Sequence, residues 1–263
     1  MLINSPRFEG TKLSFLKFSL LLHALEPKPD RKALEEITVD VLSIARADAA
    51  GILRGWFGIV SSGLSIEDAT AFQAGLRTLG CETDVVPDGD IPSLHPDFRC
   101  HLIELTAESI ILTTAMNRRQ ERGRGEFVFA AAGIVERERP VSDYEMQTEV
   151  RYTQNGAYTT QVPTRVTKFI EKDYFRIDLF FSREPHRISL EMDKDSVITY
   201  GGRPIRMKNR TELTVLLVDL GSLLPPERMN RGLRELSTEA LYPSLQAYEE
   251  EIRWAFCRLG AKG

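Results

Sequence analysis

Histidine and cysteine, the side chains most often used to bind metals, are not spaced here to act together. No two of the four histidines lie three or four residues apart, and the His-Glu-x-x-His motif is absent: His23, His95, His101 and His186. Cys100 and His101 are adjacent, so on a strand they point to opposite faces. The sequence therefore predicts no metal site and no cofactor.

The cysteines are odd in number, widely spaced and without a Cys-x-x-Cys pair: Cys81, Cys100 and Cys257. This pattern argues against a disulfide framework or a zinc ribbon and fits a reducing compartment. The nucleophile-elbow, P-loop and dinucleotide-binding glycine motifs are also absent. Ser61-Ser62-Gly63 is interpreted as a turn before a helix cap. These absences favour a non-catalytic protein and leave open a catalytic site assembled from distant residues.

Two clusters of basic residues are the remaining candidates for binding. The first falls in a loop predicted between strands at 109–115 and 126–135 and contains Arg118, Arg119, Arg122 and Arg124. The second follows the last predicted strand and contains Arg203, Arg206, Lys208 and Arg210. Guanidinium groups at a hairpin tip can hold phosphate groups through paired hydrogen bonds, although charged loops are commonly only solvated. The first cluster therefore indicates, as the alternative to a solvated loop, a weak anionic ligand.

The charge balance argues against nucleic acid as a partner. The formal net charge is −4, the pI is about 5.7, and neither basic cluster contains the aromatic residues that stack on single strands. Trp56 fits a packing role in a small unit, and Trp254 fits a role at a domain junction. Both are also candidate anchors of a protein interface, where aromatic residues are enriched.

The elements that must position these residues begin with an apolar run at 13–25. Lys17 and His23 interrupt this run and no small-residue cleavage site follows it, so neither a signal peptide nor a transmembrane segment is predicted. We expect an N-terminal helical segment over 1–30, which ends at Pro27 and Pro29 because proline cannot continue a helix. A cytoplasmic location is the matching expectation.

Residues 31–92 predict a small α/β module. Ser65 begins a capping box, in which its hydroxyl accepts a hydrogen bond from the backbone N–H of Asp68. Gly80 supplies a left-handed stop after an apolar helical stripe made of Ala69, Phe72, Leu76 and Leu79. A short strand follows at 83–86. The order of these features resembles the last part of the C-terminal domain of the bacterial ribosomal stalk protein: a glycine-serine loop, an acid-capped helix, a glycine and a strand. The resemblance implies a module that contacts other proteins.

Beyond residue 92 the apolar period changes from about 3.6 to about 2, which predicts a β-rich domain over 93–263. Strands are expected at 99–105, 109–115, 126–135, 149–153, 166–172, 174–182 and 187–192. The polar span 139–165 is interpreted as a hairpin extension or a mobile insertion. A helix capped by Asn209 and another that starts at Pro243 follow. Residues 97–224 resemble bacterial pleckstrin-homology-like domains in this order of elements.

Together these patterns predict an α+β fold, in which a small helix–strand module precedes an antiparallel β-barrel or sandwich closed by C-terminal helices. The leading functional hypothesis is a non-catalytic intracellular adaptor or scaffold that contacts a protein partner. The first alternative is a module that binds an anion or a lipid head group through the 118–124 loop. The second alternative is an enzyme whose site forms only in three dimensions.

Overall fold

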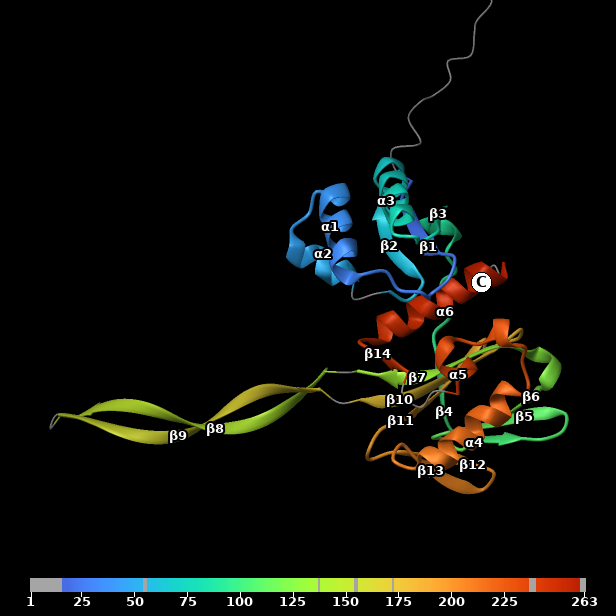
Figure 1. Ribbon diagram of the computed structural model, residues 1–263. Coiled ribbons are helices and arrows are strands. Elements are labelled where there is room, and N and C mark those ends of the chain that lie inside the picture. The colour runs from blue at the N-terminus through green and yellow to red at the C-terminus, as the bar shows by residue number, and fades with distance from the viewer. Residues whose placement is uncertain are drawn as a thin grey trace, which may run out of the picture.

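The computed structural model describes residues 16–53, 56–136, 138–153, 156–171, 173–236 and 240–260. These residues combine helices with mainly antiparallel sheets, which confirms the α+β class. The described strands form a three-stranded sheet, a nine-stranded sheet and a separate two-stranded ribbon (Figure 1). No closed barrel is formed by the described strands, so the barrel prediction is wrong.

The N-terminal unit is a three-stranded antiparallel sheet packed against helices. Its central strand β1 (Phe18–Leu22) lies between β2 (Ile59–Leu64) and β3 (Thr83–Pro87). The helices of this unit are α1 (Arg31–Leu42), α2 (Arg46–Ile52) and α3 (Ile66–Thr78). Leucines of β1 pack with Phe72 and Leu76 of α3 in one core. A short 3-10 turn, η3 (Asp88–Asp90), leads out of the unit.

The best-marked helix of the sequence, α3, forms as predicted. The Ser65 hydroxyl accepts a hydrogen bond from the N–H of Asp68 at 3.0 Å. Phe72 and Leu76 are fully buried, and Gly80 adopts the left-handed conformation with φ of +77°. Local capping and an apolar stripe are therefore sufficient to predict this element.

The helix predicted near the N-terminus is wrong in the part that the structure describes. Phe18–Leu22 is a strand, and residues 1–15 lie outside the described residues. Four of the five residues of β1 are buried, because β1 is central in its sheet and covered on both faces. Such a strand has no polar alternation and cannot be distinguished from a buried helix by its apolar pattern alone. The 31–92 module therefore receives its central strand from the preceding segment.

The nine-stranded sheet has the order β13-β12-β4-β11-β10-β7-β14, with β5 paired to β4 and β6 paired to β5. Three of its pairs are parallel, namely β4 with β11, β4 with β12, and β7 with β14. Its strands are β4 (Phe98–Leu105), β5 (Ser109–Thr114), β6 (Arg119–Gly123), β7 (Phe127–Val135), β10 (Tyr174–Phe181), β11 (Arg187–Met192), β12 (Val197–Tyr200), β13 (Arg203–Arg206) and β14 (Leu241–Tyr242). The strands predicted at 99–105, 109–115, 126–135, 174–182 and 187–192 are confirmed.

Helices cover both faces of this sheet, so β10 is buried at all eight positions. One face packs on the buried leucines of α4 (Arg210–Gly221), and the other packs on α6 (Leu245–Leu259). Asn209 caps α4 as predicted, whereas α6 starts after Ser244 rather than at Pro243. The remaining short elements are η4 (Arg124–Glu126), η5 (Pro226–Arg228) and α5 (Arg231–Arg234).

A long two-stranded ribbon projects from the nine-stranded sheet (Figure 1). It consists of β8 (Glu138–Thr153) and β9 (Gly156–Glu171), which pair antiparallel along their whole length. The span 139–165, interpreted as a hairpin extension or a mobile insertion, thus belongs to a hairpin that extends to Glu171 and includes the strands predicted at 149–153 and 166–172. Residues 154–155 and 172 lie outside the described residues. We call β8 and β9 the arm.

Candidate functional site

The metal-binding and nucleophilic side chains do not form a reactive centre among the described residues. No group of three or more histidine, cysteine, aspartate or glutamate side chains there could hold a metal ion. Burial raises the pKa of the Cys100 thiol to about 11, and burial also raises the pKa of Cys81. Because the thiolate is the reactive form, both thiols are unsuited to nucleophilic chemistry at neutral pH.

The first arginine cluster lies only partly outside regular strands, so the prediction of a loop is wrong for Arg119 and Arg122. These two residues belong to the edge strand β6 (Arg119–Gly123), which pairs antiparallel with β5, whereas Arg118 precedes β6 and Arg124 begins η4. The Arg122 guanidinium donates to the carbonyl of Glu184, and the Arg124 guanidinium donates to the carbonyl of Thr106. Arg118 and Arg119 are exposed, and strand alternation directs successive residues to opposite faces. The four guanidinium groups therefore do not converge on one point.

The second basic cluster follows β12 and spans two elements. Arg203 and Arg206 are the ends of β13, Lys208 lies in the following turn, and Arg210 begins α4. All four residues are exposed. This arrangement is that of a solvated surface rather than a recess.

Both tryptophans are covered by the chain itself. Trp56 is buried in the core of the N-terminal unit with β1 and α3 residues. The Trp254 indole Nε1 donates to the carbonyl of Leu22 at 2.7 Å, and its ring contacts the cores on both sides of α6. Trp254 therefore occupies the junction, as predicted, while Trp56 packs inside one unit.

The seat of α6 against the N-terminal unit depends on close backbone approach. Gly58 has a φ of +101°, and a Cβ at this position would lie 2.2 Å from Trp254 Cγ. The Arg258 Nη1 lies 2.8 Å from Asp84 Oδ2, and its Nε donates to the Leu22 carbonyl at 3.1 Å. The N-terminal sheet and α6, which lie next to each other in Figure 1, are thus joined by both packing and hydrogen bonds.

A cleft of about 850 Å³ opens beside this junction, between β2, the α1–α2 region and the first half of α6. Five of the six β2 residues line it: Ile59, Val60, Ser61, Ser62 and Leu64. Successive side chains of a strand point to opposite faces, so a cavity lined by consecutive residues meets the strand along its edge. β2 is also the outermost strand of its sheet among the described residues. We call this cavity the junction cleft.

The other walls of the junction cleft are partly apolar and partly charged. Leu42, Ile44 and Ile52 line one side, while Asp68, Glu250 and Arg253 supply charges. Burial raises the pKa of the Glu250 carboxyl, although its oxygen accepts a hydrogen bond from Gln246 at 2.9 Å. The volume of the cleft lies within the range of ligand-binding pockets.

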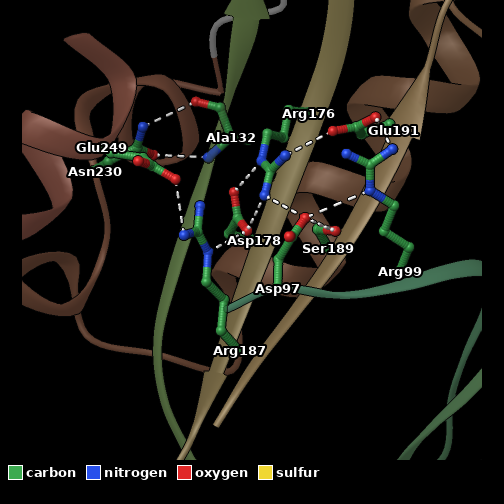
Figure 2. A network of polar contacts seen from close by, with 10 residues as sticks. All are labelled: Asp97, Arg99, Ala132, Arg176, Asp178, Arg187, Ser189, Glu191, Asn230 and Glu249. Atoms are coloured by element: carbon green, nitrogen blue, oxygen red, sulfur yellow. Dashed lines mark hydrogen bonds and ion pairs between the residues drawn. The ribbon is translucent and has the colours of Figure 1, made fainter. Parts of the chain in front are cut away.

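The α6 wall of the cleft is held on the nine-stranded sheet by a buried charge network (Figure 2). Asp178 on β10 is fully buried and accepts hydrogen bonds from Arg176 Nε at 2.6 Å and from Arg187 Nε at 2.8 Å. Burial alone would raise the pKa of Asp178, but the two guanidinium groups hold it below its usual range. The network is therefore ionised in the folded protein.

The outer contacts of this network connect three segments that are distant in sequence. Arg176 Nη2 donates to Asp97 Oδ2 at 2.9 Å, and Arg176 Nη1 donates to Glu191 at 2.6 Å. Arg187 Nη1 lies 2.8 Å from Glu249 Oε1 on α6. The segment before β4, the strands β10 and β11, and α6 are thus tied together.

A second buried group fixes α6 near its middle. The Asn230 side-chain amide accepts a hydrogen bond from the Ala132 N–H and donates one to the Ala132 carbonyl, each at 2.9 Å. The Tyr242 hydroxyl donates to Glu251 at 2.9 Å, and the N–H of Arg231 donates to the same carboxyl at 2.7 Å. Burial raises the pKa of the Glu251 carboxyl. The α6 wall therefore has a defined position.

Comparisons with known proteins give no relative from which to transfer a role. No family model, curated protein or solved structure matches this chain. Within the described ranges, the helices are too short or too polar to cross a membrane. Function has to be inferred from the geometry of the chain itself.

Proposed function

We propose that this protein is a non-catalytic adaptor that binds an extended segment of a partner protein along the outer edge of β2. The observation that supports this proposal is the junction cleft, which follows that edge over Ile59–Leu64 and is walled by α6. An unpaired strand edge presents a row of N–H and C=O groups to any extended chain that enters. Addition of such a chain as a fourth strand is a common mode of peptide recognition.

The side walls of the junction cleft would provide sequence preference. In strand addition, main-chain hydrogen bonds supply affinity, while pockets for alternate side chains supply specificity. Leu42, Ile44 and Ile52 offer apolar contacts on one wall. Asp68 and Glu250 outnumber Arg253 among the charged lining residues. The favoured occupant is therefore an extended, mainly apolar segment that carries a basic residue.

One resemblance in sequence pattern favours the same class of function. Residues 31–92 resemble the C-terminal domain of the bacterial ribosomal stalk protein, which implies a module that contacts other proteins. The pleckstrin-homology-like resemblance of residues 97–224 adds no support, because the described strands form an open sheet and no closed barrel. The free cysteines fit an adaptor that acts in a reducing compartment such as the cytoplasm.

The alternative function, anion binding through the first arginine cluster, has weaker support. Arg122 and Arg124 already donate to main-chain carbonyls, and Arg122 lies 3.8 Å from Glu126. A ligand at this edge would have to compete with those contacts or use Arg118 and Arg119 alone. The β2 edge requires no such competition from another described strand.

A peptide-selection experiment tests the proposal. A display library of random linear peptides is selected against the full chain, and the best binder is labelled for fluorescence anisotropy. Ile44→Glu is expected to weaken its binding at least about tenfold, since it removes an apolar contact and adds a charge. Val215→Glu, on an exposed position of α4, is the matched control and should bind as the unmodified protein does.

Hydrogen exchange gives the second readout. Bound peptide should slow the exchange of amides in Ile59–Leu64, because strand addition places them in hydrogen bonds. The proposal is wrong if the library yields no binder, if both glutamate variants behave alike, or if protection appears elsewhere and not at β2.

A further inference from the structure

The arm has the geometry of an interface rather than of a self-sufficient element. Its strands β8 and β9 pair only with each other among the described residues. An isolated two-stranded ribbon is at best marginally stable in water, because it has no third layer or strand to bury its side chains. Tyr144 and Met146 are 68% and 60% exposed on β8. Since they are two residues apart, they lie on the same face of the ribbon.

The prolines of the arm show which main-chain groups point outward. Proline lacks an N–H and is tolerated in a strand where that position faces away from the partner strand. Pro163 on β9 lies directly opposite Met146 on β8. Directly opposite residues of an antiparallel pair share the same hydrogen-bonding type. Met146 therefore directs its N–H and C=O to the outer edge of β8, as do the other even-numbered residues.

Pro140 gives the same result independently, because it is also an even-numbered residue of β8. The two outer edges are then unequal. Pro163 interrupts the outer edge of β9 near its middle, whereas β8 has no proline between Val141 and Thr153. The edge of β8 is therefore the one open to another strand.

The β8 sequence is complementary to itself in the antiparallel register centred on Thr148. This register places Thr148 opposite Thr148 of a second copy. Residue 145, a glutamate, then lies opposite residue 151, an arginine. Residue 146, a methionine, lies opposite residue 150, a valine. Residue 144 then lies opposite residue 152, both of them tyrosine. Opposite charges and apolar or aromatic partners are the pairs that stabilise antiparallel strands.

Registers centred on residues 146, 147 and 149 are less favourable, because each brings like charges together. A twofold axis at residue 147 would place Glu145 opposite Glu149, and an axis at residue 149 would place Glu149 opposite itself. An axis at residue 146 would place Asp143 opposite Glu149. Like charges directly opposite destabilise a pair of strands. The axis at Thr148 avoids these contacts and uses the outward-facing groups of even-numbered residues.

We infer that this protein forms a twofold-symmetric dimer through its arm, in which β8 pairs with β8 of a second copy about Thr148 to give a four-stranded sheet. The same patch on each copy meets itself, as a closed twofold interface requires. The dimer is independent of the junction cleft, so its failure would leave the proposed peptide binding untouched.

Sedimentation of matched proline variants over a range of concentrations tests the dimer. The unmodified protein is expected to sediment with twice the monomer mass. Thr148→Pro removes an outward N–H at the centre of the interface and is expected to weaken association at least about tenfold. Gln161→Pro is the control, because Gln161 lies directly opposite Thr148 on β9 and faces the other edge. Equal dissociation of both variants would overturn the inference, as would a monomeric unmodified protein.

Cysteine cross-linking and charge exchange test the register without proline. Thr148→Cys should form an intermolecular disulfide, because opposed Cα atoms about 5.5 Å apart suit that bond. Gln161→Cys should not, since three strand spacings of about 4.8 Å separate the two copies of residue 161. Glu145→Arg should dissociate the dimer, and Glu145→Arg with Arg151→Glu should restore it. Cross-linking at Gln161 alone, or no restoration, would refute the register.

Discussion

Replacing Asp178 by asparagine tests whether the buried charge network stabilises the fold. Its carboxylate accepts two hydrogen bonds from Arg176, at 2.6 and 3.0 Å, and one from Arg187 at 2.8 Å. Asparagine keeps the size of the side chain but removes its negative charge. The buried guanidinium groups of Arg176 and Arg187 would then lie beside a neutral side chain. Removing one partner of a buried ion pair costs about 3–5 kcal/mol. That is a large part of a total unfolding free energy of about 5–15 kcal/mol.

The assay is urea unfolding at neutral pH, followed by tryptophan fluorescence. The transition midpoint of Asp178→Asn should fall while the dependence on urea stays the same, since a change in stability alone shifts only the midpoint. The melting temperature should fall on the order of 10 °C, at about 2–4 °C per kcal/mol for a chain of this size.

Asp84→Asn is the matched control for this experiment. Asp84 is half-exposed and pairs with His23 at 2.9 Å and with Arg258 at 2.8 Å. Exposed pairs contribute about 0–1 kcal/mol, so this variant should change the midpoint little. If Asp178→Asn loses no more stability than Asp84→Asn, the buried network does not stabilise the fold and the reasoning is wrong.

Three further outcomes follow from the structure. Because Arg176 and Arg187 lower the folded pKa of Asp178, the unfolding free energy should decrease as pH falls below about 4, and urea midpoints should show a shallower decrease for Asp178→Asn. Ser65→Ala should lower the unfolding free energy by about 1 kcal/mol, because the α3 cap is lost; an unchanged urea midpoint would contradict this. Gly58→Ala should destabilise far more than Gly63→Ala in thermal melts. Both have positive φ, but only the first meets Trp254; equal melts would contradict this contact.

The elements that local sequence determines were predictable. Ser65 and Gly80 fix the ends of α3 through backbone hydrogen bonding and a left-handed stop, which depend only on residues nearby. The alternation in β10 likewise predicted a strand with Phe175 and Ile177 on one face. In both elements the local sequence preference agrees with the tertiary contacts, so the predicted structure is also the one that forms.

Burial on a second face was not predictable from the same patterns. Arg176 and Asp178 alternate with apolar residues, which ordinarily indicates a solvent-facing side, yet α6 covers them. The apolar pattern of Phe18–Leu22 fits a helix as well as a strand, and the strands that pair with it come from residues 59–87. In both cases the deciding partner is distant in sequence.

The candidate site, the junction cleft, could not be predicted from local sequence patterns either. The junction cleft combines β2 with α6, and no motif marks either wall. A signal for the arm was present, because the polar span 139–165 indicated a hairpin extension or a mobile insertion. The pseudo-symmetry of β8 around Thr148 becomes meaningful only once Pro163 and its register define the outer edge.

The position of α6 has a consequence for how the chain folds. The hydrogen bond between Trp254 and Leu22 joins residues 232 apart in sequence. The same helix contributes to the cores on both of its sides. Contacts of such long sequence separation form late, since the intervening chain must first be ordered. Docking of α6 completes one core of the nine-stranded sheet and the core of the N-terminal unit, so the two units are expected to unfold in one cooperative transition rather than as independent domains.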